Sequence, residues 1–151
     1  MKSAFGGVGL FMIVIFFIVL FTGYICMSIN HTRAFNVKNA VIRIIERHGT
    51  GTKNIDKLAS DITDDVVAEL NEIGYRIEST CKEGWYGFEK NNRFVEESSK
   101  ALFCIKKIET TNATLNKSMH YYQVETFYQL DIPIVKTLMR LTIKGDTIPM
   151  L

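Results

Sequence analysis

The first 27 residues constrain the fold most, because the run from Ala4 to Met27 contains no charged side chain. A hydrocarbon core of about 30 Å is crossed by about 20 helical residues, and this run has 24. A cleaved secretory signal is the alternative, but its apolar region is shorter and is followed by small residues at the cleavage site. The run ends in the bulky sequence YICM, so we expect a retained membrane anchor over residues 1–30.

Two signals disagree about the orientation of this anchor. Lysine and arginine favour the cytoplasmic side, yet only Lys2 precedes the run, whereas Arg33, Lys38 and Arg43 follow it. That bias alone favours a membrane-tethered cytoplasmic domain. The short N-terminal tail and a pair of cysteines spaced like a disulfide favour the opposite orientation. We expect a single-pass cell-membrane protein with a cytoplasmic N-terminus and its C-terminal domain outside.

Residues 31–151 form a segment of about 120 residues, the usual size of one domain. The 18 lysines and arginines include one upstream residue, and all 16 acids lie downstream, so this domain carries a net charge of +1. It has no basic stripe with interleaved aromatics, no repeat and no low-complexity tract. A nucleic acid is therefore not an expected partner. Membrane lipid is an expected partner because of the anchor.

Helical periodicity continues past the anchor. One apolar stripe has helical spacing and comprises Ala34, Val37, Val41, Ile44, Ile45 and His48. Gly49 follows where a left-handed cap belongs. The stripe indicates an amphipathic helix packed on its own domain. A more specific interpretation, compatible with the first, is one long helix with its first half in lipid and its second half covered by a β-sheet.

A second helix is predicted from Ser60, as the capping residue, to Gly74, which ends it. Its buried face would hold Ile62, Val66, Leu70 and Ile73. Asp64 and Asp65 could suggest a metal or acid–base site, but neighbouring helical positions diverge by about 100°. We interpret the pair as stabilising the start of the helix.

From Tyr75 the period changes to two. Short alternating segments at 75–81, 101–110, 121–132 and 138–148 predict antiparallel strands, and residues 83–94 look like a loop. In the third segment, one face is predicted to be buried and the other solvated. The buried set is Val124, Thr126, Tyr128, Leu130 and Ile132; the solvated set is Gln123, Glu125, Gln129 and Asp131. The expected fold is α+β: an anchor helix continuing into an amphipathic helix, a second short helix, then a small sheet of three to four strands.

Cys81 and Cys104 lie on two candidate strands that bracket the aromatic loop, which favours a disulfide, with two reduced buried cysteines as the alternative. His31, His48 and His120 have no metal-ligand spacing, and no catalytic or phosphate-binding motif occurs. We expect no metal, no cofactor, no small-molecule substrate and no enzymatic activity.

The loop between those cysteines contains three aromatic residues, Trp85, Tyr86 and Phe88. They are candidates for a partner-binding patch. We favour the alternative, in which they fold back onto the sheet, because large aromatics are mostly buried.

In this layout the chain resembles the TadE-like minor pseudopilins of bacterial tight-adherence (type IV pilus-like) loci. The matching parts are the N-terminal span, KNAVIRIIERHG, the IGY…C…FCI arrangement and the C-terminal YYQVETFYQLDIPIVKTLMRLTIKGDTI. One departure is that FGGVGLFMIV has no glutamate after its glycines, unlike substrates of prepilin peptidase. The departure argues against cleavage by that peptidase and against classical incorporation into a filament.

The resemblance implies a non-enzymatic role in pilus assembly, through helix packing in the membrane and contacts with other pilin-like or secretion-machinery subunits. The small-residue sequence GGVG, with Gly6, Gly7 and Gly9, offers a surface for such packing. A membrane-anchored binding module that uses the aromatic loop is the competing function.

Overall fold

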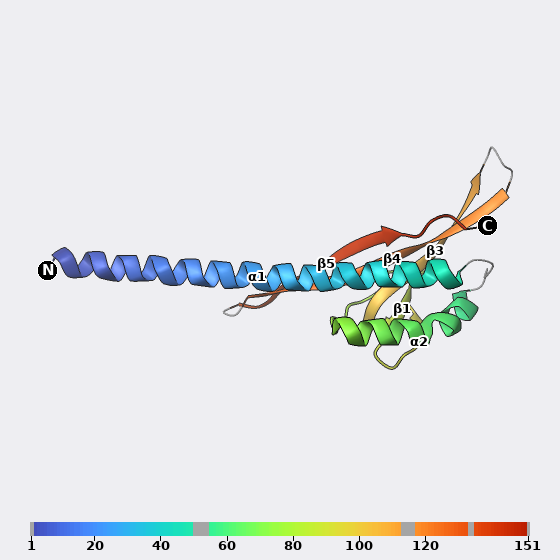
Figure 1. The fold of residues 1–151 in the computed structure, drawn as a ribbon, viewed down its shortest axis with the longest axis horizontal. Coiled ribbons are helices and arrows are strands. Elements are labelled where there is room, and N and C mark those ends of the chain that lie inside the picture. The colour runs from blue at the N-terminus through green and yellow to red at the C-terminus, as the bar shows by residue number, and fades with distance from the viewer. Residues whose placement is uncertain (1, 50–54, 113–116, 133–134, 151) are drawn as a thin grey trace.

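The computed structural model describes residues 2–49, 55–112, 117–132 and 135–150. The chain folds into two helices followed by a five-stranded antiparallel sheet of order β2-β1-β3-β4-β5 (Figure 1). The α+β class is confirmed, with one strand more than the sequence predicted. The elements are α1 Lys2–His48, α2 Ile55–Ile73, β1 Tyr86–Glu89, β2 Phe94–Glu96, β3 Ala101–Asn112, β4 Lys117–Ile132 and β5 Val135–Asp146.

Helix α1 runs without a break for 47 residues, which is about 70 Å at 1.5 Å per residue. Its first half projects away from the other elements, and its second half lies along the sheet beside α2 (Figure 1). The predicted apolar stripe is buried there: Ala34, Val37, Val41, Ile44 and Ile45 all lie in the interior. The two interpretations of the stripe therefore describe the same long helix.

Gly49 ends α1, although not by the predicted left-handed cap. Its N–H donates to the Ile45 carbonyl at 2.6 Å, and among the described glycines only Gly74 and Gly84 have positive φ. A Cβ at Gly49 would lie 2.5 Å from that same carbonyl oxygen. Glycine is therefore required at this position by space rather than by φ.

Helix α2 begins at Ile55, five residues before Ser60, the predicted capping residue. The Ser60 hydroxyl donates to the Lys57 carbonyl inside the helix and does not cap it. The earlier start brings Leu58 into the core, on the same face as Ile62, because burial outweighs the local capping preference. The end was predicted correctly, since Gly74 has φ 67° and its N–H donates to the Leu70 carbonyl.

Two sequence predictions about the segment before β3 were wrong. Residues 75–81 form no strand, and only an isolated bridge joins Ser79 to Ala101. The segment predicted as a loop forms the β1–β2 hairpin instead, with Asn92 at φ 60° in its turn. Asparagine tolerates this left-handed conformation. The rings of Phe88 and Phe94, 4.9 Å apart, both pack on the ring of Phe103 and so hold the hairpin against β3.

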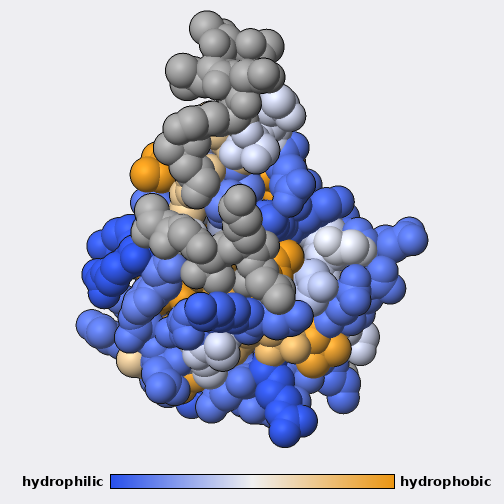
Figure 2. All heavy atoms as spheres, turned by 90° about the vertical axis from the view of Figure 1, so that its right-hand side faces the viewer, coloured by the Kyte–Doolittle hydropathy of each residue, from blue (hydrophilic) through white to orange (hydrophobic). Residues whose placement is uncertain are grey.

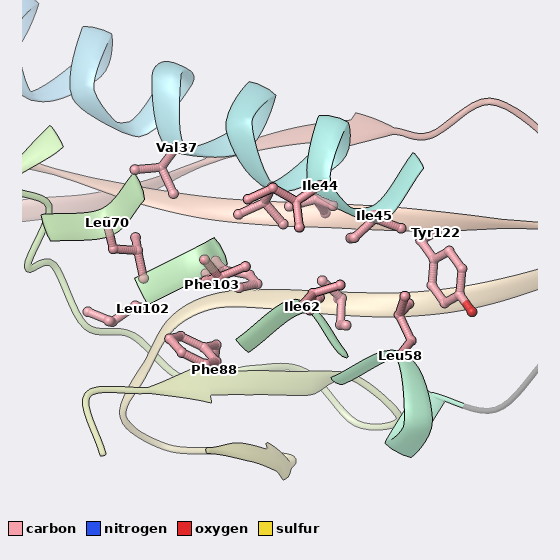
Figure 3. Close-up of a cluster of buried hydrophobic side chains, with 14 of the residues drawn as sticks. Val37, Ile44, Ile45, Leu58, Ile62, Leu70, Phe88, Leu102, Phe103 and Tyr122 are labelled. Atoms are coloured by element: carbon pink, nitrogen blue, oxygen red, sulfur yellow. The ribbon is translucent and has the colours of Figure 1, made fainter. Parts of the chain in front are cut away.

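The main core lies between the two helices and one face of the sheet (Figure 3). Val124 and Thr126 point into it, as predicted. The opposite face of β4 is not fully solvated: Glu125 is 2% exposed and Phe127 is buried. Residues before β3 fold across this face, and they bring Cys81 and Trp85 over it. Leu130, Asp131 and Ile132 lie outside the residues whose side chains are described.

Candidate functional site

The first half of α1 is exposed and apolar on all sides. Between Val8 and Ile29 its large side chains are exposed except that of Val19, which is half-buried, with Phe11 at 62% and Tyr24 at 71%. By length and composition this helix could cross a membrane. The opposite end of the molecule has a mostly hydrophilic surface (Figure 2). One end of the molecule is thus suited to an apolar environment and the other to water.

The glycines predicted as a helix-packing surface lie in this exposed half. A Cβ at Gly7 or at Gly9 would meet no other atom within 4 Å. The surroundings of Gly6 lie outside the part of the helix whose exposure is described. Gly23, further along the same helix, is equally open. The space beside Gly7 and Gly9 is therefore available to another helix.

Beyond the projecting half, two hydrogen bonds join α1 to β4, one donated by each element. The Asn30 side-chain amide donates to the Gln129 carbonyl at 3.1 Å. One turn further, the Thr126 hydroxyl donates to the Ala34 carbonyl at 3.0 Å. Because Asn30 and Ala34 are one helical turn apart, the two bonds hold α1 to β4 at two successive levels.

Cys81 and Cys104 are joined by a disulfide, as the sequence predicted, with Cα atoms 5.8 Å apart. The bond is buried against the outer face of the sheet together with Trp85 and Phe127. Gly87 makes this packing possible, because a Cβ there would lie 2.7 Å from the Cys81 sulfur. The disulfide attaches the segment before β3 to the sheet.

Glu125 lies beneath this covering segment. Its carboxylate is 3.4 Å from the Lys82 ammonium, which is itself largely exposed. The ammonium of Lys144 lies 5.7 Å from the centre of the Trp85 ring. A buried carboxylate is stable only when it is paired. Lys82 provides that pairing for Glu125, which the alternation along β4 had placed on the solvated face.

The three loop aromatics are placed mainly inside. Trp85 is 5% exposed and Phe88 is 1% exposed, whereas Tyr86 is half-buried. The charge of Glu96, opposite Tyr86 in the hairpin, raises the pKa of the Tyr86 hydroxyl. Trp85 and Phe88 thus belong to the core, as the favoured alternative predicted, and they present no aromatic patch to a partner.

An open cavity of about 570 Å³ lies between the end of α2 and the β1–β2 hairpin. Its rim includes Arg76 and Lys90, and Lys90 is paired with Glu78 at 2.7 Å. Its floor is apolar, formed by Leu70, Phe88 and neighbours. Among the described residues that line the cavity, none form a recognisable catalytic arrangement.

The three histidines lie in three separate places. His48 Nε2 is 3.0 Å from the Asp65 carboxylate and links α1 to α2. The His31 ring packs on Tyr128, and the His120 ring packs on Tyr122. Because α2 begins at Ile55, Asp65 lies in the middle of that helix and does not stabilise its start, contrary to the prediction from the sequence. Its carboxylate instead pairs with His48 and so joins α2 to α1. Among the described residues, no three potential metal ligands lie together.

No protein-family model, curated protein or solved structure matches the chain.

Proposed function

We propose that the protein is a single-pass membrane subunit, pilin-like and resembling the TadE-like proteins, that acts in pilus assembly without enzymatic activity. One observation carries the proposal: α1 is a single helix whose first half is bare and apolar and whose second half is the core of the domain. A subunit built this way transmits the packing of its membrane helix directly to the position of its folded domain.

Helix association in lipid supports the proposal. Apolar helices gain no hydrophobic free energy by meeting in a bilayer, so they associate by close packing at small residues. Gly7 and Gly9 are open on α1, and large side chains such as Phe11 surround them. This end of the helix therefore suits close approach of a second helix from another pilin-like or secretion-machinery subunit.

The proposed topology places the N-terminus in the cytoplasm and the disulfide-bonded domain outside the cell membrane. Disulfides persist in oxidising compartments and are rare in the cytosol, so the bond between Cys81 and Cys104 supports the outside position. The positively charged residues after the span oppose it. The disulfide is the stronger argument here because it joins buried residues of the fold itself.

A matched pair of glycine variants tests the function. Gly7→Leu fills the proposed contact, whereas Gly23→Leu makes the same change at an equally open position of the same helix. Both substitutions keep the helix apolar, so both proteins should remain in the membrane. A photoreactive residue at Phe11, exposed in the structure, reports contacts in cells.

We expect Gly7→Leu to remove the crosslinks and to reduce surface pili, while Gly23→Leu leaves both near the wild-type level. Equal behaviour of the two variants, with crosslinks intact, would contradict assembly through this surface. The competing function, a ligand-binding module that uses the aromatic residues near β1, is tested at Tyr86, because Trp85 is buried and its replacement would disturb the core. If these residues bound a ligand, Tyr86→Ala would lose function and Gly7→Leu would not.

A further inference from the structure

We propose that the groove between α1 and α2 is an interface for a second copy of this chain. The two copies form a parallel dimer whose twofold axis runs along the membrane normal. The inference goes beyond the proposed function, and it rests only on the membrane anchorage contained in that proposal. It assigns an interaction surface to the folded domain.

The groove follows the line along which α1 and α2 lie side by side (Figure 1). Two cavities form it, one of about 570 Å³ and one of about 250 Å³. Ala40, Arg43 and Glu69 line both cavities, so the two make one continuous surface. Ala40 is buried, and Ala68 of α2 is exposed. Because alanine carries only a methyl group, another helix can approach closely here.

The two walls of the groove carry opposite charges. Arg43 and Arg47 of α1 lie along one wall, and Glu69 and Glu72 of α2 lie along the other. Among the residues that the structure describes, none of these four forms a salt bridge, although all of them line the same groove. The groove therefore holds complementary charges that do not pair with each other within one chain.

The charges on the two walls lie at the same height above the membrane, because α1 and α2 are antiparallel. At the end of α1 that is far from the anchor, His48 Nε2 lies 3.0 Å from the Asp65 carboxylate of α2. Closer to the anchor, Asn36 and Ile73 line the same cavity. The two arginines and the two glutamates all lie between these levels on their own helices.

A twofold axis parallel to α1 brings unlike walls together. Rotation by 180° about such an axis places the α1 wall of one copy opposite the α2 wall of the other copy, with every height unchanged. Arg43 of each copy then faces Glu69 of the other, so the contact occurs twice. Twofold dimers of this kind are the commonest homo-oligomers, and complementary charges of this kind fix the orientation of a contact.

The membrane anchor favours a second copy as the occupant of the groove. Two copies inserted in one bilayer with the same orientation are parallel, so a twofold axis that relates them must lie along the membrane normal. This is the one twofold arrangement in which the two walls complement each other at equal height. Exposed ion pairs add little affinity by themselves, but confinement to one bilayer raises the effective concentration of the second copy.

Energy transfer between copies in liposomes tests the proposal. Full-length Cys26→Ser protein is labelled at Ile148→Cys, with the donor and the acceptor dye attached in separate batches. Ile148 is 64% exposed and does not line the groove. The batches are mixed in detergent and reconstituted at a low protein-to-lipid ratio, so that chance encounters contribute little transfer. Flotation of the liposomes checks that the protein is inserted.

Two charge reversals, one on each wall, give the decisive comparison. Arg43→Glu and Glu69→Arg each place like charges opposite one another in the dimer, so either variant alone should lose most of the wild-type transfer. A mixture of the two variants should recover the transfer, because unlike charges then meet at both contacts. Each chain in the mixture still carries like charges on its own two walls, so the recovery has to come from contacts between chains.

The controls are Lys100→Glu and Glu83→Arg, which make the same reversals at exposed residues outside the groove and should leave transfer unchanged. The interface would be overturned by absent transfer in the wild type, by full transfer in either single groove variant, by equal losses in the controls, or by a mixture that does not recover. Protein that does not float with the liposomes would overturn the anchorage and this proposal with it. Failure of the Gly7→Leu comparison would count against the proposed function alone.

Discussion

The Tyr75 hydroxyl hydrogen-bonds to both backbone groups of Phe127. It accepts from the Phe127 N–H at 3.0 Å and donates to the Phe127 carbonyl. The pairing between β3 and β4 ends at Thr126, so Phe127 is the first residue of β4 that lacks a partner on β3. The tyrosine side chain takes the place of that strand partner in the buried interior.

Tyr75→Phe should lower the free energy of unfolding by about 1–3 kcal/mol, because two buried backbone groups lose their partner. Denaturant unfolding of the detergent-solubilised protein measures the change. Tyr121→Phe is the control, since Tyr121 is a half-buried tyrosine on β4. A loss of the same size in both variants would contradict a specific role for the Tyr75 hydroxyl.

Burial raises the pKa of Tyr75, and the hydrogen bond with Phe127 offsets part of that effect. The unfolded chain ionises this tyrosine near its ordinary pKa of about 10, whereas the folded chain keeps the proton. The unfolded state then binds fewer protons, so the stability supplied by Tyr75 is complete below pH of about 10 and falls above it. Unfolding midpoints measured with rising pH should fall less steeply in Tyr75→Phe than in the wild type. Parallel curves for the two proteins would refute this linkage.

Gly87→Ala should destabilise the outer face of the sheet. The new Cβ would lie 2.6 Å from the Ala101 Cβ and 2.7 Å from the Cys81 sulfur, and overpacking of this kind costs about 1–3 kcal/mol. Thermal unfolding measures the loss. Gly23→Ala adds the same methyl group in open space and should be neutral or slightly stabilising. An unchanged midpoint in Gly87→Ala would mean that the covering segment is not packed as described.

The disulfide between Cys81 and Cys104 should be present in the native cell and on the opposite side of the membrane from Lys2. Non-reducing peptide mapping after alkylation detects the bond. In the loop-entropy model, replacing both cysteines by serine should cost about 3 kcal/mol of stability. Free thiols that react with an impermeant maleimide only after permeabilisation would instead place the domain in the cytoplasm.

The two helices show how much the local pattern could predict. The uncharged run and the stripe through Val37, Val41 and Ile45 fixed α1 and its buried side, because side chains three and four apart share one helix face. The same rule located Ile62 and Val66 in α2 and Gly74 at its end. The start of α2 was missed, since Leu58 is held by tertiary packing and not by a capping residue; the left-handed cap at Gly49 and the role of Asp65 at the start of α2 were also predicted wrongly.

The covered face of the sheet shows the limit. Alternation along β4 located Val124 and Thr126 correctly, but it placed Glu125 in solvent. Whether the second face of a strand meets water depends on which distant segment folds across it. Here that segment is the one with Cys81 and Trp85, and two sequence signals pointed to it: the pairing of Cys81 with Cys104 and the burial expected of the aromatic residues.

The sequence by itself thus determined the long helix, its apolar half and the three long strands β3, β4 and β5, because these depend on the composition and period of neighbouring residues. The tertiary structure alone decided that the β1–β2 hairpin forms, that Glu125 is buried beside Lys82, and that β4 runs along α1 from Ala34 to Asn30. The last two are contacts between residues far apart in the chain, and the hairpin is held in place by its pairing with β3. Local periodicity carries no information about such contacts, because they are selected by how well complete surfaces pack together.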